Sequence, residues 1–280
     1  MLALNNSVDN TAQKLHSCQL LLAGELKRIC DKNNIKYYMI AGTLLGAVRH
    51  KGFIPWDDDM DFAIMRKDFS KFISACEKDL GDDFELQDMF SDEHYALPVA
   101  KLLLKGTNFT ERNSLKNKSK KGIFIDIFPY DNIPDTEKQR ASHNKNTYFL
   151  KRLFLAKQGY TIAEKGQFIK SLVYFALKVI SVFVSKKWLR NRLDKELRRF
   201  ENETTKKVAA IGGAYNYAKE SVEREWFDEA VLLPFEDLTL SAPKEYIKYL
   251  TYFYGDYMTP PPENKRYNRH GAVGIDFGKY

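Results

Sequence analysis

The chain has 280 residues, of which 44% are hydrophobic, 14% aromatic and 29% charged. This composition excludes a disordered protein, and the length leaves room for a buried core in one or two domains. The formal net charge of +7 is uneven, because residues 138–207 carry +13 and the remainder carries −6. A basic segment beside an acidic part indicates contact with an anionic partner, such as a membrane surface, a lipid-linked phosphate or a nucleic acid.

The cysteines and apolar runs indicate an intracellular protein. Cys18, Cys30 and Cys76 form no CxxC pair and no zinc-type spacing with His, so we expect reduced thiols in the core. The N-terminus lacks the features of a signal peptide, so we expect no export. The apolar run Leu172–Val184 would reach only about 20 Å as a helix, too short for a hydrocarbon core of about 30 Å. We therefore expect the protein in the cytoplasm or on the inner face of the cytoplasmic membrane.

The first half of the chain alternates predicted helices and strands. Apolar residues recur at three- and four-residue spacing from about residue 10 to 32, which predicts a helix. Residues 37–41 predict a buried strand, followed by a helix from near Thr43 to His50. Gly42 and Thr43 would form the turn between them, where a hydroxyl and free N–H groups favour phosphate oxygens. Further strands are predicted over 60–65, 98–104 and 122–130, with a helix over 67–80.

Asp57, Asp58, Asp59 and Asp61 lie within five positions. Like charges this close need a cation or protons to coexist. Because side chains alternate along a strand, Asp59 and Asp61 are expected to point to the same side, while the residues between and after them enter the core. Oxygen-only ligands suit Mg²⁺ or Mn²⁺, so the sequence predicts a divalent-metal site here.

Two further charged residues lie in predicted strands. Asp126 stands between Ile125 and Ile127, where a carboxylate is costly without a cation or hydrogen-bond donors. Asp126 is therefore the predicted third metal ligand. Lys101 is either a solvated residue of an edge strand or a phosphate ligand.

From about residue 135 to 207, Lys and Arg are interspersed with aromatic residues around the apolar stretch FIKSLVYFALKVISVFV. One interpretation is a buried pair of helices with a solvated basic face. The other is an interfacial helix within residues 168–192 whose basic flanks contact anionic lipid headgroups. Those flanks comprise Lys165, Lys170, Lys186, Lys187, Arg190 and Arg192. Beyond residue 208, Asp228, Glu236, Asp256 and His270 are polar residues of types that turns and caps also use.

Several motifs together resemble a known family. AGTLLGAVRH, GFIPWDDDMDF, FIDIFPYD and a C-terminal pattern containing YGDYM and PPE are similar to the LicD family of phosphotransferases, which includes the fukutin-related enzymes. The resemblance implies an α/β (α+β) fold with a nucleotidyltransferase-like mixed sheet, flanking helices and additional mainly helical segments. It divides the chain into a catalytic core at 1–136, a basic, partly apolar helical segment at 137–207, and a C-terminal segment at 208–280 that completes the substrate site.

The resemblance also implies roles for individual residues. Asp59, Asp61 and Asp126 would be the catalytic residues and the metal ligands, and Asp58 ranks below its neighbours because some relatives have His there. Together with the reasoning above, the predicted substrate-binding residues are Gly42, Thr43, Arg49, Trp56, Asp57, Lys101 and His270.

Members of the family move a phosphorylated alcohol from its CDP-activated form to a sugar hydroxyl. We therefore expect Mg²⁺- or Mn²⁺-dependent transfer, of phosphocholine first, to a cell-surface glycan such as lipopolysaccharide, teichoic acid or capsule, or to its lipid-linked precursor, with release of CMP. Trp56 beside the aspartates suits recognition of a choline cation. The alternatives are ribitol- or glycerol-phosphate transfer, a nucleotidyltransferase that releases pyrophosphate, and a membrane or nucleic-acid adaptor without activity. The intact acids oppose the adaptor, and we expect no nucleic-acid partner.

Overall fold

The computed structural model describes residues 2–161, 168–266 and 272–280. The helices are α1 (Leu2–Lys32), α2 (Ala41–Arg49), α3 (Arg66–Asp79), α4 (Glu137–Lys157), α5 (Phe168–Val182), α6 (Lys186–Leu197), α7 (Tyr217–Glu220) and α8 (Tyr246–Tyr254). The strands are β1 (Tyr38–Met39), β2 (Asp61–Met65), β3 (Phe84–Gln87), β4 (Ala100–Leu104), β5 (Asn108–Glu111), β6 (Ile123–Ile133), β7 (Lys207–Ala209), β8 (Ser221–Glu223), β9 (Ala230–Phe235), β10 (Leu238–Pro243) and β11 (Ala272–Asp276).

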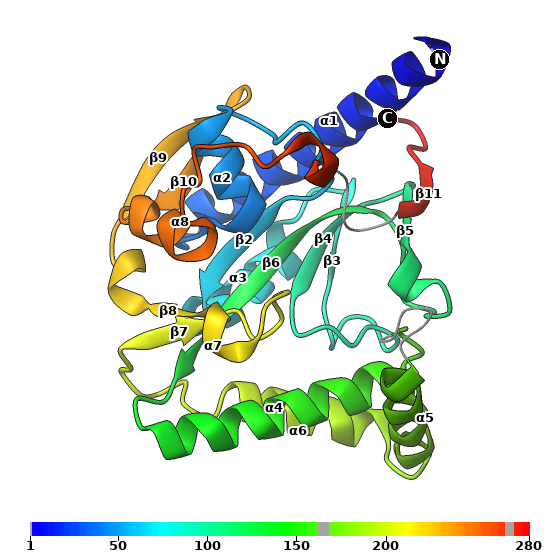
Figure 1. The fold of residues 1–280 in the computed structure, drawn as a ribbon, viewed down its shortest axis with the longest axis vertical. Helices are drawn as coiled ribbons and strands as arrows, with labels where there is room; N and C mark the ends of the chain where they lie inside the picture. The colour runs from blue at the N-terminus through cyan, green and yellow to red at the C-terminus, as the bar shows by residue number, and fades with distance from the viewer. Residues whose placement is uncertain (1, 162–167, 267–271) are drawn as a thin grey trace.

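A mixed sheet forms the centre of the molecule, with the strand order β1-β2-β6-β4-β3 (Figure 1). Strands β2 and β6 run parallel and their other neighbours are antiparallel. Strand β7 pairs with the end of β6, and β8 pairs with β7, so residues after 206 extend the sheet of the first segment. This arrangement confirms the predicted mixed α/β fold of nucleotidyltransferase type.

Helices α1 and α3 contact one face of the sheet and lie behind it in Figure 1. The apolar stripe of α1 is buried as its spacing predicts, with Leu22, Leu26 and Ile29 fully inaccessible to solvent. Cys18, Cys30 and Cys76 are free, buried thiols in this layer, which confirms the prediction of core cysteines. Asp61 of β2, Lys101 of β4 and Asp126 of β6 lie on the opposite face of the sheet.

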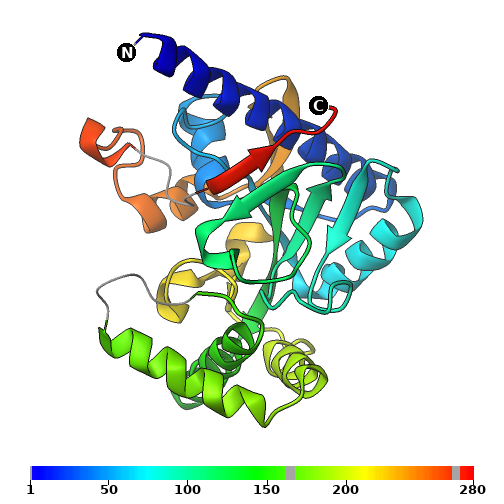
Figure 2. The ribbon, with the colours of Figure 1, turned by 90° about the vertical axis from the view of Figure 1, so that its right-hand side faces the viewer.

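Helices α4 and α6 form a second layer below the sheet, with a core of their own (Figure 1). This second core comprises Met89, Tyr95, Ala96, Ile133, Leu150, Leu153, Phe154, Tyr160, Leu189, Leu193, Leu197, Ala209 and Ile211. Helix α5 runs across α4 at the outer edge of the layer (Figures 1 and 2). The prediction of a buried helix pair therefore describes α4 and α6 but is wrong for the apolar stretch, because α5 leaves most of its apolar side chains exposed.

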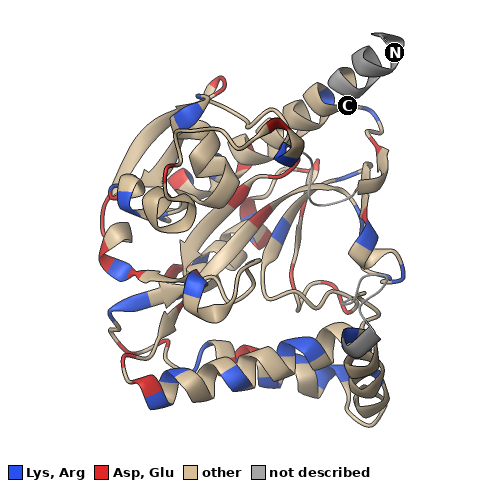
Figure 3. Ribbon diagram, in the orientation of Figure 1, with Lys and Arg blue, Asp and Glu red and all other residues tan. Residues whose placement is uncertain are grey.

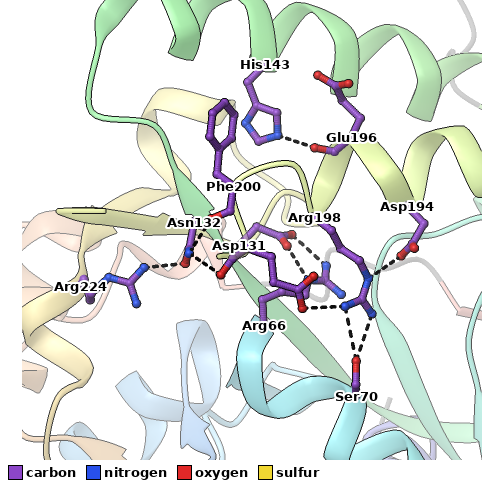
Figure 4. A network of polar contacts seen from close by, with 11 residues as sticks. Arg66, Ser70, Asp131, Asn132, His143, Asp194, Glu196, Arg198, Phe200 and Arg224 are labelled. Carbon is purple, nitrogen blue, oxygen red and sulfur yellow. Dashed lines mark hydrogen bonds and ion pairs between the residues drawn. The ribbon is translucent and has the colours of Figure 1, made fainter. Parts of the chain in front are cut away.

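A polar network joins the two layers (Figure 4). The Arg66 guanidinium donates to both carboxylate oxygens of Asp131 at 2.5 and 2.9 Å, and both side chains are buried. The side-chain amide of Asn132 donates to the carbonyl groups of Phe200, Glu201 and Glu203 after α6. The end of β6 is thus tied both to the helix after β2 and to the second layer.

None of the helices in the described part of the chain is both long and apolar enough to cross a bilayer. This agrees with the prediction that Leu172–Val184 does not span a membrane.

Candidate active site

The connection between β1 and α2 is tighter than the sequence suggests. Ala41 has a φ of 47° and makes the turn, one residue earlier than predicted, so Gly42 and Thr43 lie in the first turn of α2. First-turn N–H groups have no partner within their own helix, so this remains a position suited to phosphate oxygens. The Thr43 hydroxyl is buried and accepts a hydrogen bond of 2.7 Å from the Asp61 N–H. This hydroxyl holds the start of β2, and its own O–H remains a donor, so its contact with phosphate stays a prediction.

Position 42 needs glycine because the Asp57 side chain lies very close to it. A Cβ atom at this position would lie 2.4 Å from Oδ2 of Asp57, so only glycine lets that carboxylate lie against α2. We predict that Gly42→Ala keeps the fold, because the obstructed atom ends a side chain that can turn away. Transfer activity should fall by about a hundredfold, since displacing a reacting group by about 1 Å costs this much.

Gly24→Ala is the matched control for this prediction. Gly24 lies in α1, where a Cβ atom would have no neighbouring atom within 4 Å, and alanine should stabilise that helix by about 1 kcal/mol. Steady-state kinetics and thermal melts separate the two variants, and full activity of Gly42→Ala would show that the position of Asp57 is unimportant.

Two side chains of α1 hold the backbone of residues 57–59, the aspartate loop. The side chain of Gln19 donates to the Asp58 carbonyl at 2.7 Å, and His16 donates from Nε2 to the Asp57 carbonyl at 2.9 Å. Among the described residues, Asp57, Asp58 and Asp59 are the acids whose ligand atoms all lie within 4.8 Å of one another. Asp58, which the family resemblance ranks below its neighbours, therefore belongs to this compact cluster.

The parallel strands β2 and β6 place the remaining acids side by side. Asp61 is the Cα partner of Asp126, so both side chains leave the sheet on the same face. Asp59 precedes β2, which begins at Asp61 and not at residue 60 as predicted. Exposure alternates from partly exposed Asp59 through buried Met60 to partly exposed Asp61, as expected for two acids on one side. Asp57, Asp58, Asp59, Asp61 and Asp126 are together called the acidic region.

Lys101 is buried in an interior strand. Because β4 lies between β3 and β6, the interpretation of Lys101 as a solvated edge residue is wrong. Its Nζ atom lies 3.5 Å from carboxylate oxygens of both Asp126 and Glu111, and 3.0 Å from the centroid of the Phe124 ring. Lys101 therefore supplies positive charge to the acidic region from within the sheet.

Arginines and an aromatic ring border the aspartate loop on the side of the C-terminal segment. The Arg49 guanidinium donates to the Tyr257 carbonyl at 2.9 Å, and burial lowers the pKa of Arg49. The Arg266 guanidinium lies 5.4 Å from the centroid of the Trp56 ring, and its charge also lowers the pKa of Arg49. Two cations and Trp56 are thus gathered next to Asp57. The predicted site residue His270 lies outside the described residues.

Several residues at this site were not predicted from the sequence, including His16, Gln19, Glu111, Tyr254 and Arg266. Burial raises the pKa of the Tyr254 phenol, and the charges of Asp61 and Asp57 raise it further, so Tyr254 stays protonated beside the aspartates. A polar Gln19 next to the apolar stripe of α1 was a usable signal. Tyr254 gave none, because it is one of 16 tyrosines. Glu236 and Asp256 accept hydrogen bonds from Phe53 N–H and from the Thr259 hydroxyl, as residues of turns do.

A cleft of about 1150 Å³ lies between α4 and residues 209–220, and Glu220 is buried in its wall. Burial raises the pKa of Glu220 to about 7. The hydrogen bond from Tyr215 N–H and the charge of Lys151 act in the opposite direction but are smaller effects. Burial also raises the pKa of Tyr130, and the charges of Glu220 and Asp61 add to it. The charges of Glu220 and Asp61 thus both act on the buried Tyr130 phenol.

The raised pKa of Glu220 makes stability depend on pH. Between about pH 4.5 and 7 the folded state keeps a proton that the unfolded state has lost, so stability falls as pH rises through this window. The total loss is on the order of 3 kcal/mol. We predict that Glu220→Gln removes this loss: the variant should match the wild type near pH 4.5 and unfold at a higher denaturant concentration at pH 8. A difference in denaturation midpoint between the two proteins that stays the same at every pH would contradict this.

Comparison with known proteins decides the family. Residues 34–163 match the family described as "LicD/FKTN/FKRP, nucleotidyltransferase domain". The chain is also 26% identical over 245 residues to the lipopolysaccharide cholinephosphotransferase LicD of Haemophilus influenzae, which covers 86% of this chain and 89% of that protein. Residues 34–163 belong to the LicD/FKTN/FKRP nucleotidyltransferase domain family. The chain is accordingly a LicD-family phosphotransferase, and the interpretation as an adaptor without activity is set aside.

Two further relatives of this LicD-family chain share a short segment with it. Uncharacterized proteins of Rickettsia prowazekii and Rickettsia typhi are each 55% identical over 47 residues, or 17% of this chain and 18% and 15% of theirs.

Proposed function

We propose that this LicD-family enzyme transfers a phosphorylated alcohol, phosphocholine first, from its CDP-activated form to a hydroxyl of a cell-surface glycan or its lipid-linked precursor. The observation that carries the proposal is the pairing of Asp61 with Asp126 on parallel strands, beside the compact cluster Asp57–Asp59. The activity in the name of the Haemophilus influenzae relative supports phosphocholine as the transferred group.

The donor set suits Mg²⁺ or Mn²⁺, because the acidic region supplies carboxylate oxygens and no softer ligand. We assign Asp59 and Asp61 as the residues that would hold the ion, with Asp57 and Asp58 beside them. Asp126 would either complete the ligand set or accept the proton of the acceptor hydroxyl. When bound, the ion would neutralise negative charge on the donor diphosphate.

The chain's own groups would do the remaining work of binding and proton transfer. The first-turn N–H groups at Gly42 and Thr43 would bind phosphate oxygens, and Arg49 and Arg266 would offset the charge of the leaving CMP. Trp56 would contact the alcohol or the base of the donor.

In the reaction, the acceptor hydroxyl oxygen forms a bond to the phosphorus that carries the alcohol, and the bond from this phosphorus to the CMP oxygen breaks. CMP leaves with the electron pair of the broken bond, and where Asp126 acts as the base, the hydroxyl proton passes to it. Lys101, 3.5 Å from Asp126, balances the carboxylate charge until the proton arrives. Positioning and electrostatics thus supply most of the catalysis, as in other phosphoryl transfers.

A donor panel tests the proposal. CDP-choline, CDP-ribitol and CDP-glycerol are incubated separately with the full chain, Mg²⁺ and a crude glycan acceptor, and CMP release is measured. We expect the highest rate with CDP-choline. A higher rate with CDP-ribitol or CDP-glycerol would identify ribitol or glycerol, in place of choline, as the transferred alcohol. A lack of CMP release from all three donors would overturn the proposal.

A further inference from the structure

Helix α5 packs on the protein through one narrow stripe. Tyr174, Leu177, Ser181 and Val184 recur at three- and four-residue spacing and are the half-buried or buried positions of residues 170–184. Leu177 and Val184 contact the second core. The remaining positions in this range are exposed, so more than half of the helix circumference faces away from the protein.

The exposed side of α5 is apolar. Leu172, Phe175 and Val179 recur at the same spacing on the side opposite the buried stripe, and Phe183 follows directly after the helix; the four side chains are 60%, 63%, 45% and 86% exposed. Exposed apolar neighbours on this side are Val173, Ile180 and Val182. A helix that faces water carries polar residues at such positions, whereas contiguous exposed apolar side chains mark an interaction surface.

The charges around this surface have one sign. Residues 166–193 contain six Lys and Arg and no Asp or Glu. Lys170, Lys178 and Lys187 are exposed beside the apolar side chains, and Trp188 at the start of α6 is 53% exposed. Figure 3 shows that Lys and Arg also predominate along α4 and α6. The partner must therefore offer both an apolar interior and negative charge.

We propose that α5 docks the protein on an anionic membrane surface, lying in the plane of the interface with Leu172, Phe175, Val179 and Phe183 among the lipids. Lys170, Lys178 and Lys187 contact the headgroup phosphates. An apolar face bordered by Lys and Arg next to a Trp is the pattern of interfacial helices. The helix has 15 residues, which suits an orientation along the membrane and not across it.

A second copy of the chain fits this surface less well. A two-fold dimer brings the same patch of both subunits together, so each positive border would meet an identical one. An anionic lipid surface has no such conflict. The proposal rests on the packing and charge of α5 and not on the transferase chemistry, so lipid binding can be measured without any substrate.

Co-sedimentation with vesicles tests the proposal on the full chain. We expect sedimentation with vesicles of phosphatidylglycerol and phosphatidylcholine, at least about tenfold weaker binding to phosphatidylcholine alone, and release by added NaCl, because salt screens the headgroup contacts. Equal binding to both compositions, or no binding to either, would overturn the proposal.

Two variants separate the apolar and the charged contributions. Phe175→Ser with Phe183→Ser should weaken binding to the anionic vesicles by at least about tenfold, as expected for two lost phenyl groups. Lys178→Gln with Lys187→Gln should weaken it by about tenfold and reduce its salt dependence. The matched control is Leu232→Ser with Ile247→Ser, which changes exposed apolar residues of β9 and α8, and it should bind like the wild type.

Circular dichroism checks that each variant is folded, and sedimentation velocity without lipid checks for self-association. The proposal would be overturned if the control variant lost vesicle binding as strongly as the α5 variants do. A wild-type dimer that Phe175→Ser with Phe183→Ser dissociates would assign the surface to a second copy of the chain and would also overturn it.

Discussion

Replacing Asp61 with Asn is expected to reduce transfer by about a thousandfold or more, because charge stabilisation by a bound metal ion supplies several kcal/mol. The fold should survive, since two backbone hydrogen bonds hold this position in β2 whichever side chain it carries. Its N–H donates to Thr43 Oγ1 at 2.7 Å and its carbonyl accepts from the Ile40 N–H at 3.1 Å. Asp59→Asn should give a similar loss, because Asp59 lies in the compact cluster two residues earlier.

A thermal measurement distinguishes loss of the site from loss of the fold. Without metal, Asp61→Asn should melt no lower than the wild type, since it removes one like charge from a crowded acidic region. Saturating Mg²⁺ or Mn²⁺ should raise the melting temperature of the wild type and raise that of Asp61→Asn much less. The control Asp237→Asn, at the exposed turn between β9 and β10, should behave as the wild type in both assays. An Asp61→Asn enzyme with full activity would contradict the assigned role.

Replacing Asp131 with Asn is expected to cost about 3–5 kcal/mol of unfolding free energy, because it leaves the buried Arg66 guanidinium without its carboxylate. The melting temperature should fall by about 10 °C. Met65 and Tyr130 are the last Cα partners of β2 and β6, so Arg66 and Asp131 follow directly on the paired strands. The pair therefore fixes the far end of the two strands that carry Asp61 and Asp126.

Two comparisons isolate the effect of burial in this prediction. Asp194→Asn removes a carboxylate from the partly exposed Arg198, 3.0 Å away, and should cost less than about 1 kcal/mol. Replacing both buried partners, Arg66→Met with Asp131→Leu, should recover much of the lost stability, because no charge is then left buried. Equal destabilisation by Asp131→Asn and Asp194→Asn would contradict this account of the pair.

Periodicity and turn residues were sufficient to predict most helices and strands of the layer that contains the acidic region. The helix predicted over 67–80 is α3, and the strands predicted over 98–104 and 122–130 are β4 and β6. Strand alternation also explains why Asp61 and Asp126 share a face once β2 and β6 are parallel neighbours. That neighbourhood is a property of the sheet order, which the family resemblance implied and the periodicity of a single strand does not contain.

The errors concern contacts between residues far apart in the sequence. Lys101 looked like an edge residue because the position of β4 inside the sheet cannot be seen from its own five residues. Gly42 was interpreted as the turn, whereas Ala41 makes the turn and Gly42 makes room for Asp57. The apolar stretch of α5 suggested burial, because hydrophobicity does not reveal whether another element of the chain covers it.

The most direct test of the proposed chemistry is the identity of the products formed from CDP-choline. The full chain, Mg²⁺ and a glycan acceptor are followed by phosphorus NMR, with the Asp61→Asn variant as the control. We expect the diphosphate resonances of the donor to be replaced by those of CMP and of a phosphodiester that carries choline on the glycan, and we expect the variant to form neither. Products in which the cytidylyl group is attached to the acceptor while phosphocholine is released would contradict this expectation.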